Sequence, residues 1–159
     1  MKTRKIALYG VLLALAFIFS YLEHLIPSPP GIKFGLANMV VMIALFLLGT
    51  RAALLLSLIR IVLVGMTFGN LYSMLYSLAG GMLSFAVMAL LKNTKRFGTL
   101  GVSVAGGVMH NLGQILVAML VVERVEVIYY YPVLLFTGSV AGILVGTLAA
   151  LVLRHLPKR

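Results

Sequence analysis

Arg60 is the residue whose type and position most restrict the chemistry of this chain. It lies in the long apolar stretch Phe34–Phe68, about two to three helical turns beyond Arg51. An arginine inside a membrane costs at least about 2.5 kcal/mol on insertion scales, so it normally faces a partner or a cavity. Glu23 is the natural counter-charge, unless it is a surface carboxylate at a helix end. Two interpretations of Arg60 therefore remain open: a structural or snorkelling cation, and a cation that binds a ligand.

A second group of polar residues, His110, Asn111 and Gln114, favours hydrogen bonding to a substrate. His110 and Gln114 are four residues apart and share one helix face. No second histidine or carboxylate stands at ligand spacing, so we expect no metal site. The remaining candidates carry amide, hydroxyl or ammonium groups: Asn38, Asn70, Tyr72, Ser73 and Lys33. For the two asparagines, hydrogen bonding between helices is an equally good interpretation.

Residue types that are missing exclude several kinds of chemistry. The 159 residues include no cysteine and no aspartate, so thiol catalysis and the paired aspartates that bind Mg²⁺ and diphosphate in prenyl transfer are both absent. The net charge of +10 is spread between apolar runs and forms no basic stripe, so nucleic acid is not an expected partner. We expect a protein that is not catalytic by itself and that uses no cofactor.

The elements that must position these residues are transmembrane helices. Hydrophobic residues make up 62% of the chain and the mean hydropathy is +1.14, which predicts a single transmembrane domain over residues 1–159. With about 20 residues for each span, we predict an all-α bundle of six transmembrane helices. Their ranges are Lys5–Ile26, two short helices within Phe34–Phe68 divided at Gly49–Arg51, Asn70–Leu91, Leu100–Val122 and Pro132–Leu153.

The distribution of basic residues predicts the orientation of this bundle. Lys and Arg accumulate in cytoplasmic segments, and an N-in, C-in topology places ten of them inside and two, Lys33 and Arg124, outside. The inside set is Lys2, Arg4, Lys5, Arg51, Lys92, Lys95, Arg96, Arg154, Lys158 and Arg159. We therefore expect a multi-pass protein of the cytoplasmic membrane whose polar candidates gather in the outer half of the bilayer.

Small residues on the first helix suggest a surface for close packing. Gly10 and Ala14 lie four residues apart, which places them on one face for internal packing or for a membrane partner.

Several motifs, spread over nearly the whole chain, resemble one known family. They are Tyr21-Leu22-Glu23-x-Leu25-Ile26-Pro27, Pro30-Gly31-Ile32-Lys33-x-Gly35-Leu36-Ala37-Asn38, Arg60 with Phe68-Gly69, Ser77-Leu78-Ala79-Gly80-Gly81, and His110-Asn111-x-Gly113-Gln114. They resemble the Gx transporter family, which is often labelled heptaprenyl diphosphate synthase component I and is grouped with the substrate-binding S components of energy-coupling factor (ECF) transporters.

The resemblance implies an S-component-like importer subunit. Such a subunit would bind a vitamin-like molecule in its outer half, under the loop from Pro27 to Lys33, and present it to an ECF-type coupling protein and ATPases. S components commonly dock through an Ala-x-x-x-Ala stripe on the first helix, where this chain has Gly10 and Ala14 instead. The alternative is a non-catalytic membrane subunit associated with polyprenyl diphosphate or quinone synthesis, or with an electron-transfer assembly.

Overall fold

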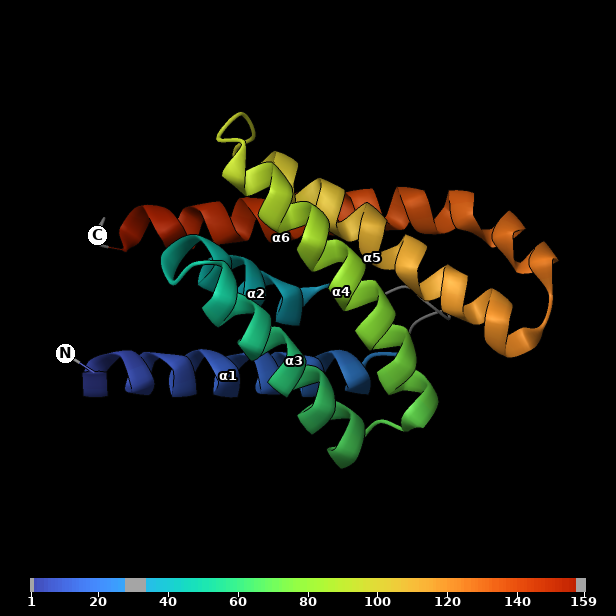
Figure 1. Cartoon of the computed structure of the whole chain (residues 1–159), viewed down its shortest axis with the longest axis horizontal. Coiled ribbons are helices and arrows are strands. Elements are labelled where there is room, and N and C mark those ends of the chain that lie inside the picture. The colour runs from blue at the N-terminus through green and yellow to red at the C-terminus, as the bar shows by residue number, and fades with distance from the viewer. Residues whose placement is uncertain (1, 28–33, 157–159) are drawn as a thin grey trace.

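The chain folds into six α-helices and one short 3₁₀ helix. The computed structural model describes residues 2–27 and 34–156, and within these ranges it contains no strand. The elements are α1 (Lys2–Leu25), α2 (Leu36–Leu47), α3 (Thr50–Thr67), α4 (Leu71–Asn93), α5 (Thr99–Val122), η1 (Val125–Tyr130) and α6 (Tyr131–His155) (Figure 1). The prediction of an all-α protein is confirmed.

Five of the six α-helices are long and apolar enough to cross a membrane, so this is a multi-pass membrane protein. The exception is α2, which has 12 residues. At about 1.5 Å per residue it is about 18 Å long, well short of the hydrocarbon core. The sequence predicted two short helices within Phe34–Phe68, and α2 is the shorter of the two that the structure has there. The six-span topology stays a prediction.

The short helix α2 is surrounded by protein, which explains why it does not need the length of a bilayer. It packs against α1, α3 and α6. Seven of its residues are buried: Ala37, Val40, Val41, Met42, Ile43, Ala44 and Leu45. Because α2 is enclosed by protein, the chain at its two ends can leave the helix within the membrane without facing lipid. The thickness of the bilayer therefore does not fix the length of α2.

The six α-helices, with α2 between α1 and α6, form a ring around a central space. Along this ring, α1 contacts α3, α3 contacts α4, α4 contacts α5, and α5 contacts α6, which returns to α1 through α2. The start of α1, the end of α6 and the α2–α3 connection lie toward one end of the molecule, while the α3–α4 connection and η1 lie toward the other (Figure 1). An N-in, C-in topology requires this arrangement; which end faces the cytoplasm stays a prediction.

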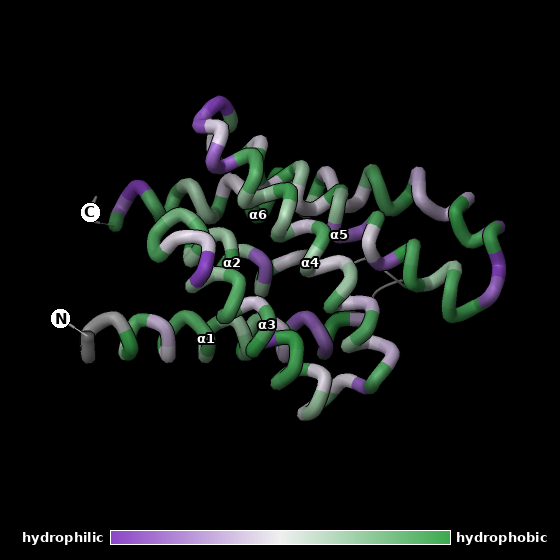
Figure 2. Tube along the Cα trace, viewed as in Figure 1, coloured by the Kyte–Doolittle hydropathy of each residue, from purple (hydrophilic) through white to green (hydrophobic). Residues whose placement is uncertain are grey.

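Hydropathy along the chain agrees with a lipid environment. In Figure 2 the helices are mostly hydrophobic, and hydrophilic colour is strongest at the α4–α5 connection and between α5 and η1. Large apolar side chains also face outward, including Met66 at 79% exposure and Leu120 at 78%. Such residues would not be left exposed to water in this number, so we interpret their surface as lipid-facing.

Three glycines, Gly107 of α5 with Gly138 and Gly142 of α6, form a glycine seam where these two helices pack together. A Cβ added to Gly107 would collide with the backbone carbonyl oxygen of Gly138, and a Cβ on Gly142 would come within 2.6 Å of the Cα of Val104. Backbone atoms cannot move aside as a flexible side chain can. The two helices can therefore approach this closely only because glycine occupies these positions.

We predict that Gly107→Ala lowers the free energy of unfolding by about 1–3 kcal/mol through overpacking. The measurement is thermal unfolding of the detergent-purified protein. Gly10→Ala is the matched control, because Gly10 is also helical and a Cβ there would meet nothing within 4 Å. Equal melting temperatures for the two variants would show that the seam is not tightly packed.

Candidate functional site

The central space contains a cavity of about 460 Å³ to which all six α-helices contribute. Its polar lining residues include Ser20 and Glu23 from α1, Asn38 from α2, Arg60 from α3, Ser73 and Ser77 from α4, and His110 and Asn111 from α5; α6 contributes Gly138, Ala141, Gly142 and Val145. A cavity of this size accommodates a small organic molecule.

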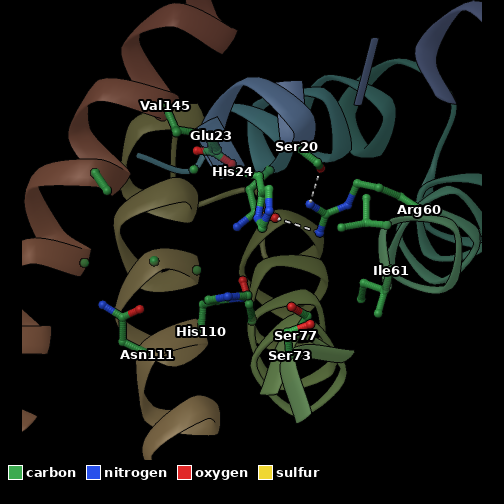
Figure 3. Close-up of a pocket in the computed structure, with 18 of the residues that line it drawn as sticks. Ser20, Glu23, His24, Arg60, Ile61, Ser73, Ser77, His110, Asn111 and Val145 are labelled. Atoms are coloured by element: carbon green, nitrogen blue, oxygen red, sulfur yellow. Dashed lines mark hydrogen bonds between the residues drawn. The ribbon is translucent and has the colours of Figure 1, made fainter. Parts of the chain in front are cut away.

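Arg60 lies at the wall of this cavity and is held by neutral groups. Its Nη1 donates to Ser20 Oγ at 3.4 Å and its Nη2 donates to Asn38 Oδ1 at 3.2 Å. Its Nε is buried and has no hydrogen-bond partner among the described residues. In Figure 3 the guanidinium group reaches into the same space as the His110 ring. The local arrangement therefore orients a cation without neutralising it.

Glu23 does not form the direct ion pair expected from the sequence. Its Oε1 accepts a hydrogen bond of 2.8 Å from the backbone N–H of Leu36, the first residue of α2. A carboxylate at this position satisfies a free N–H of the helix end and interacts favourably with the helix dipole. Glu23 also lines the cavity and is close enough to Arg60 for an electrostatic interaction.

The structure separates the three polar residues of α5. His110 lines the cavity, and in Figure 3 its ring faces the space that Arg60 enters. Asn111 also lines it, but its Nδ2 donates to the carbonyl oxygen of Leu134 at 2.7 Å, which ties α5 to α6. Gln114 is 7% exposed, lies against Gly80 of α4 and is not part of the cavity lining.

The residues at the start of α4 have a structural role as well as a place near the cavity. Asn70 and Ser73 both line it and form a capping box, in which each side chain accepts a hydrogen bond from the backbone N–H of the other. Tyr72 is 60% exposed and lies outside the cavity lining, so the structure does not bring it to the site. Lys33 lies outside the described residues.

Sequence reasoning missed several residues that complete the cavity. Ser20 precedes Glu23 by three residues, and this spacing on one helix face was the available signal. Ser84 and Ser103 also line the cavity, but as uncharged residues they gave no signal in the sequence.

Aromatic packing joins α1 to the end of α3. The ring of Phe68 is packed against the three α1 residues Phe17, Tyr21 and His24, at centroid distances of 5.3 to 5.5 Å.

Two further expectations concern metal binding, for which no site was expected, and the small-residue face of the first helix. Within residues 2–27 and 34–156 there is no group of three or more His, Cys, Asp or Glu residues that could hold a metal ion. Gly10 and Ala14 are both exposed on α1. This leaves their face available to lipid or to a partner.

Comparison with known proteins identifies one family. A family model described as heptaprenyl diphosphate synthase component I matches residues 12–152, which include every candidate substrate-binding residue. No curated protein and no solved structure matches the chain. The description names a component rather than a whole synthase, in agreement with a subunit that is not catalytic by itself, and it implies a further component as partner.

Proposed function

We propose that this chain, which belongs to the heptaprenyl diphosphate synthase component I family, is the membrane-embedded substrate-binding subunit of an importer for a small anionic molecule. The observation that carries the proposal is Arg60, whose hydrogen-bond partners in the cavity, Ser20 and Asn38, are both neutral. A cation at this depth is costly unless it serves a ligand or pathway. A carboxylate or phosphate entering the cavity would give Arg60 a directly hydrogen-bonded anion, which Glu23 does not provide.

The position of the cavity in the bundle supports uptake from the outside. Its rim includes Pro27, Gly69 and Asn70, which belong to the α1–α2 and α3–α4 connections. The basic residues Arg51, at the start of α3, and Lys95, in the α4–α5 connection, belong to the other ends of these helices. If the basic end is cytoplasmic, the cavity opens to the outside of the cytoplasmic membrane.

Energy for import would come from other proteins. The chain has no phosphate-binding nucleotide loop motif and no aspartate, so it would capture the ligand by itself, and translocation and release would use partners such as an ECF-type coupling protein and ATPases. The exposed Gly10 and Ala14 would offer the coupling protein a close approach to α1.

A second candidate is suggested by the family description: a non-catalytic membrane subunit that supports polyprenyl diphosphate synthesis. If the basic end is cytoplasmic, the rim of this cavity lies at the opposite end, away from a partner enzyme in the cytoplasm. This geometry favours the importer subunit over the synthase subunit.

The deciding experiment is ligand binding to the purified chain in lipid nanodiscs. We expect saturable binding of at least one member of a panel of flavins, quinone precursors and carboxylate- or phosphate-bearing vitamins. In parallel, the chain is added to a polyprenyl diphosphate synthase partner and product formation is measured. A folded chain that binds none of the panel while accelerating prenyl synthesis would replace the first candidate by the second.

A further inference from the structure

The cavity continues below the level of Arg60 as a deep extension, which we call the serine arm. It is lined by Met42, Ser84, Met88, Ser103 and Gly106. On α4 the lining runs from Ser77 to Ser84, and on α5 from His110 to Ser103. Each interval is seven residues, or about 10 Å along a helix. We call the part of the cavity around Arg60, Ser77 and His110 the polar chamber. The arm therefore reaches about 10 Å farther into the bundle than this chamber.

Two serines in the arm make no hydrogen bond with the described residues. Ser84 is 5% exposed and Ser103 is 4% exposed, and neither side chain has a partner among the described residues. Five other helical hydroxyls donate to a carbonyl oxygen four residues earlier, those of Ser20, Thr67, Thr137, Ser139 and Thr147. Ser57, which is buried outside the cavity lining, also makes no hydrogen bond with the described residues. Neither hydroxyl oxygen is among the fully buried unpaired atoms, so each keeps surface toward the cavity and is available to a ligand.

Glycines allow the neighbouring helices to pack closely beside the serines. A Cβ on Gly106 would come within 3.2 Å of Ser84 Oγ and 2.6 Å of Met88 Sδ. A Cβ on Gly146 would come within 2.8 Å of Ser103 Cβ. The hydroxyl of Ser84 thus faces α5, and the side chain of Ser103 faces α6. Both serines lie where three helices meet beneath the chamber.

We propose that the serine arm is a second subsite of the same cavity, which binds the neutral, hydroxyl- or amide-bearing end of an elongated anionic ligand. This inference rests on the proposed function, because Arg60 binds the charged end. The ligand class is then an anion whose polar, uncharged groups lie about 10 Å from its charge. An apolar tail would leave both serine hydroxyls without partners, so the arm selects against it.

The first test asks whether the arm connects to the chamber, and it requires no known ligand. Because the natural chain has no cysteine, Ser84→Cys and Ser103→Cys each introduce a single thiol. We expect both variants, in nanodiscs, to react with anionic 2-sulfonatoethyl methanethiosulfonate. Ser139→Cys on α6 is the control, because its position is outside the cavity lining and should be shielded by lipid. Failure of both arm variants to react, with Ser77→Cys reacting in the chamber, would overturn the proposal.

The second test asks whether the serines recognise hydroxyl groups. Sorbitol 6-phosphate and hexyl phosphate have similar length and charge and differ in their hydroxyls. We expect the natural chain to prefer sorbitol 6-phosphate, and Ser84→Ala/Ser103→Ala to reduce that preference about tenfold through the loss of two hydrogen bonds. Ser139→Ala should leave the preference unchanged. Equal binding of the two phosphates by the natural chain would overturn hydroxyl recognition.

The two proposals fail in different ways. If neither phosphate binds and Arg60→Gln does not alter the rate of Ser77→Cys labelling by the anionic reagent, the anion site itself is absent. If binding and labelling depend on Arg60 but the serine variants change nothing, the anion site stands and only the second subsite is wrong.

Discussion

Arg60→Gln is expected to lower the affinity for an anionic ligand at least about 30-fold, because truncating one partner of a buried charge pair costs about 2–5 kcal/mol. Glutamine keeps a polar side chain that can still contact Asn38, the partner of Arg60 Nη2. The fold should survive the change, since removing an intramembrane cation removes an insertion cost of about 2.5 kcal/mol or more. The measurement is equilibrium binding in nanodiscs together with the melting temperature.

Two further variants separate charge from geometry. Arg60→Lys keeps a positive charge but loses the planar fork that reaches both Ser20 and Asn38, so we expect an intermediate affinity. Arg96→Gln removes an exposed cation from the α4–α5 connection and should leave binding unchanged. Anion binding by Arg60→Gln at the parental affinity would show that Arg60 is a structural cation.

The helices that could be predicted from the sequence are those with simple apolar runs between basic or proline-containing breaks. The predicted Leu100–Val122 corresponds to α5 at Thr99–Val122, and the predicted break at Gly49 is the position where φ is 92° before α3 begins. The length of α2 was not predictable in the same way. A helix enclosed by protein and a helix in lipid are both apolar on every face, so hydropathy cannot distinguish them.

The site was predictable to the extent that charge and helical spacing determine it. Arg60 and Asn38 were both predicted, and their contact follows from similar depth on neighbouring helices. Tyr72 could have been excluded, because it is adjacent to Ser73 and points about 100° away from it around α4. The partner of Glu23 was not predictable, since the free N–H groups of α2 appear only once the position of that helix end is known.

The short helix α2 has a charged side chain from another helix at each end, and this arrangement leads to the last prediction. At its start, Glu23 accepts from the N–H of Leu36. Near its end, Lys92 of α4 donates to the carbonyl oxygen of Leu45 at 2.8 Å, with its Nζ 5.8 Å from the centre of the Phe46 ring. An anion at the start of a helix and a cation at its end both interact favourably with the helix dipole.

We therefore expect Glu23→Gln and Lys92→Met each to lower the free energy of unfolding by about 1–3 kcal/mol, the range for hydrogen bonds to charged groups. The two losses should add, because the ends of α2 are about 18 Å apart and share no partner. Thermal unfolding of both single variants and the double variant measures this, with Arg96→Met in the exposed connection as the control.

Ligand affinity should respond to only one of the same two substitutions. Glu23→Gln removes a negative charge from the cavity that holds Arg60, so affinity for an anion should rise even as stability falls. Lys92→Met acts at the far end of α2, outside the cavity lining, and should leave affinity unchanged. A fall in affinity in Glu23→Gln would mean that Glu23 holds the ligand or orients Arg60. A rise would mean that Glu23 organises α2 while opposing the anion, and that Arg60 alone supplies the attraction.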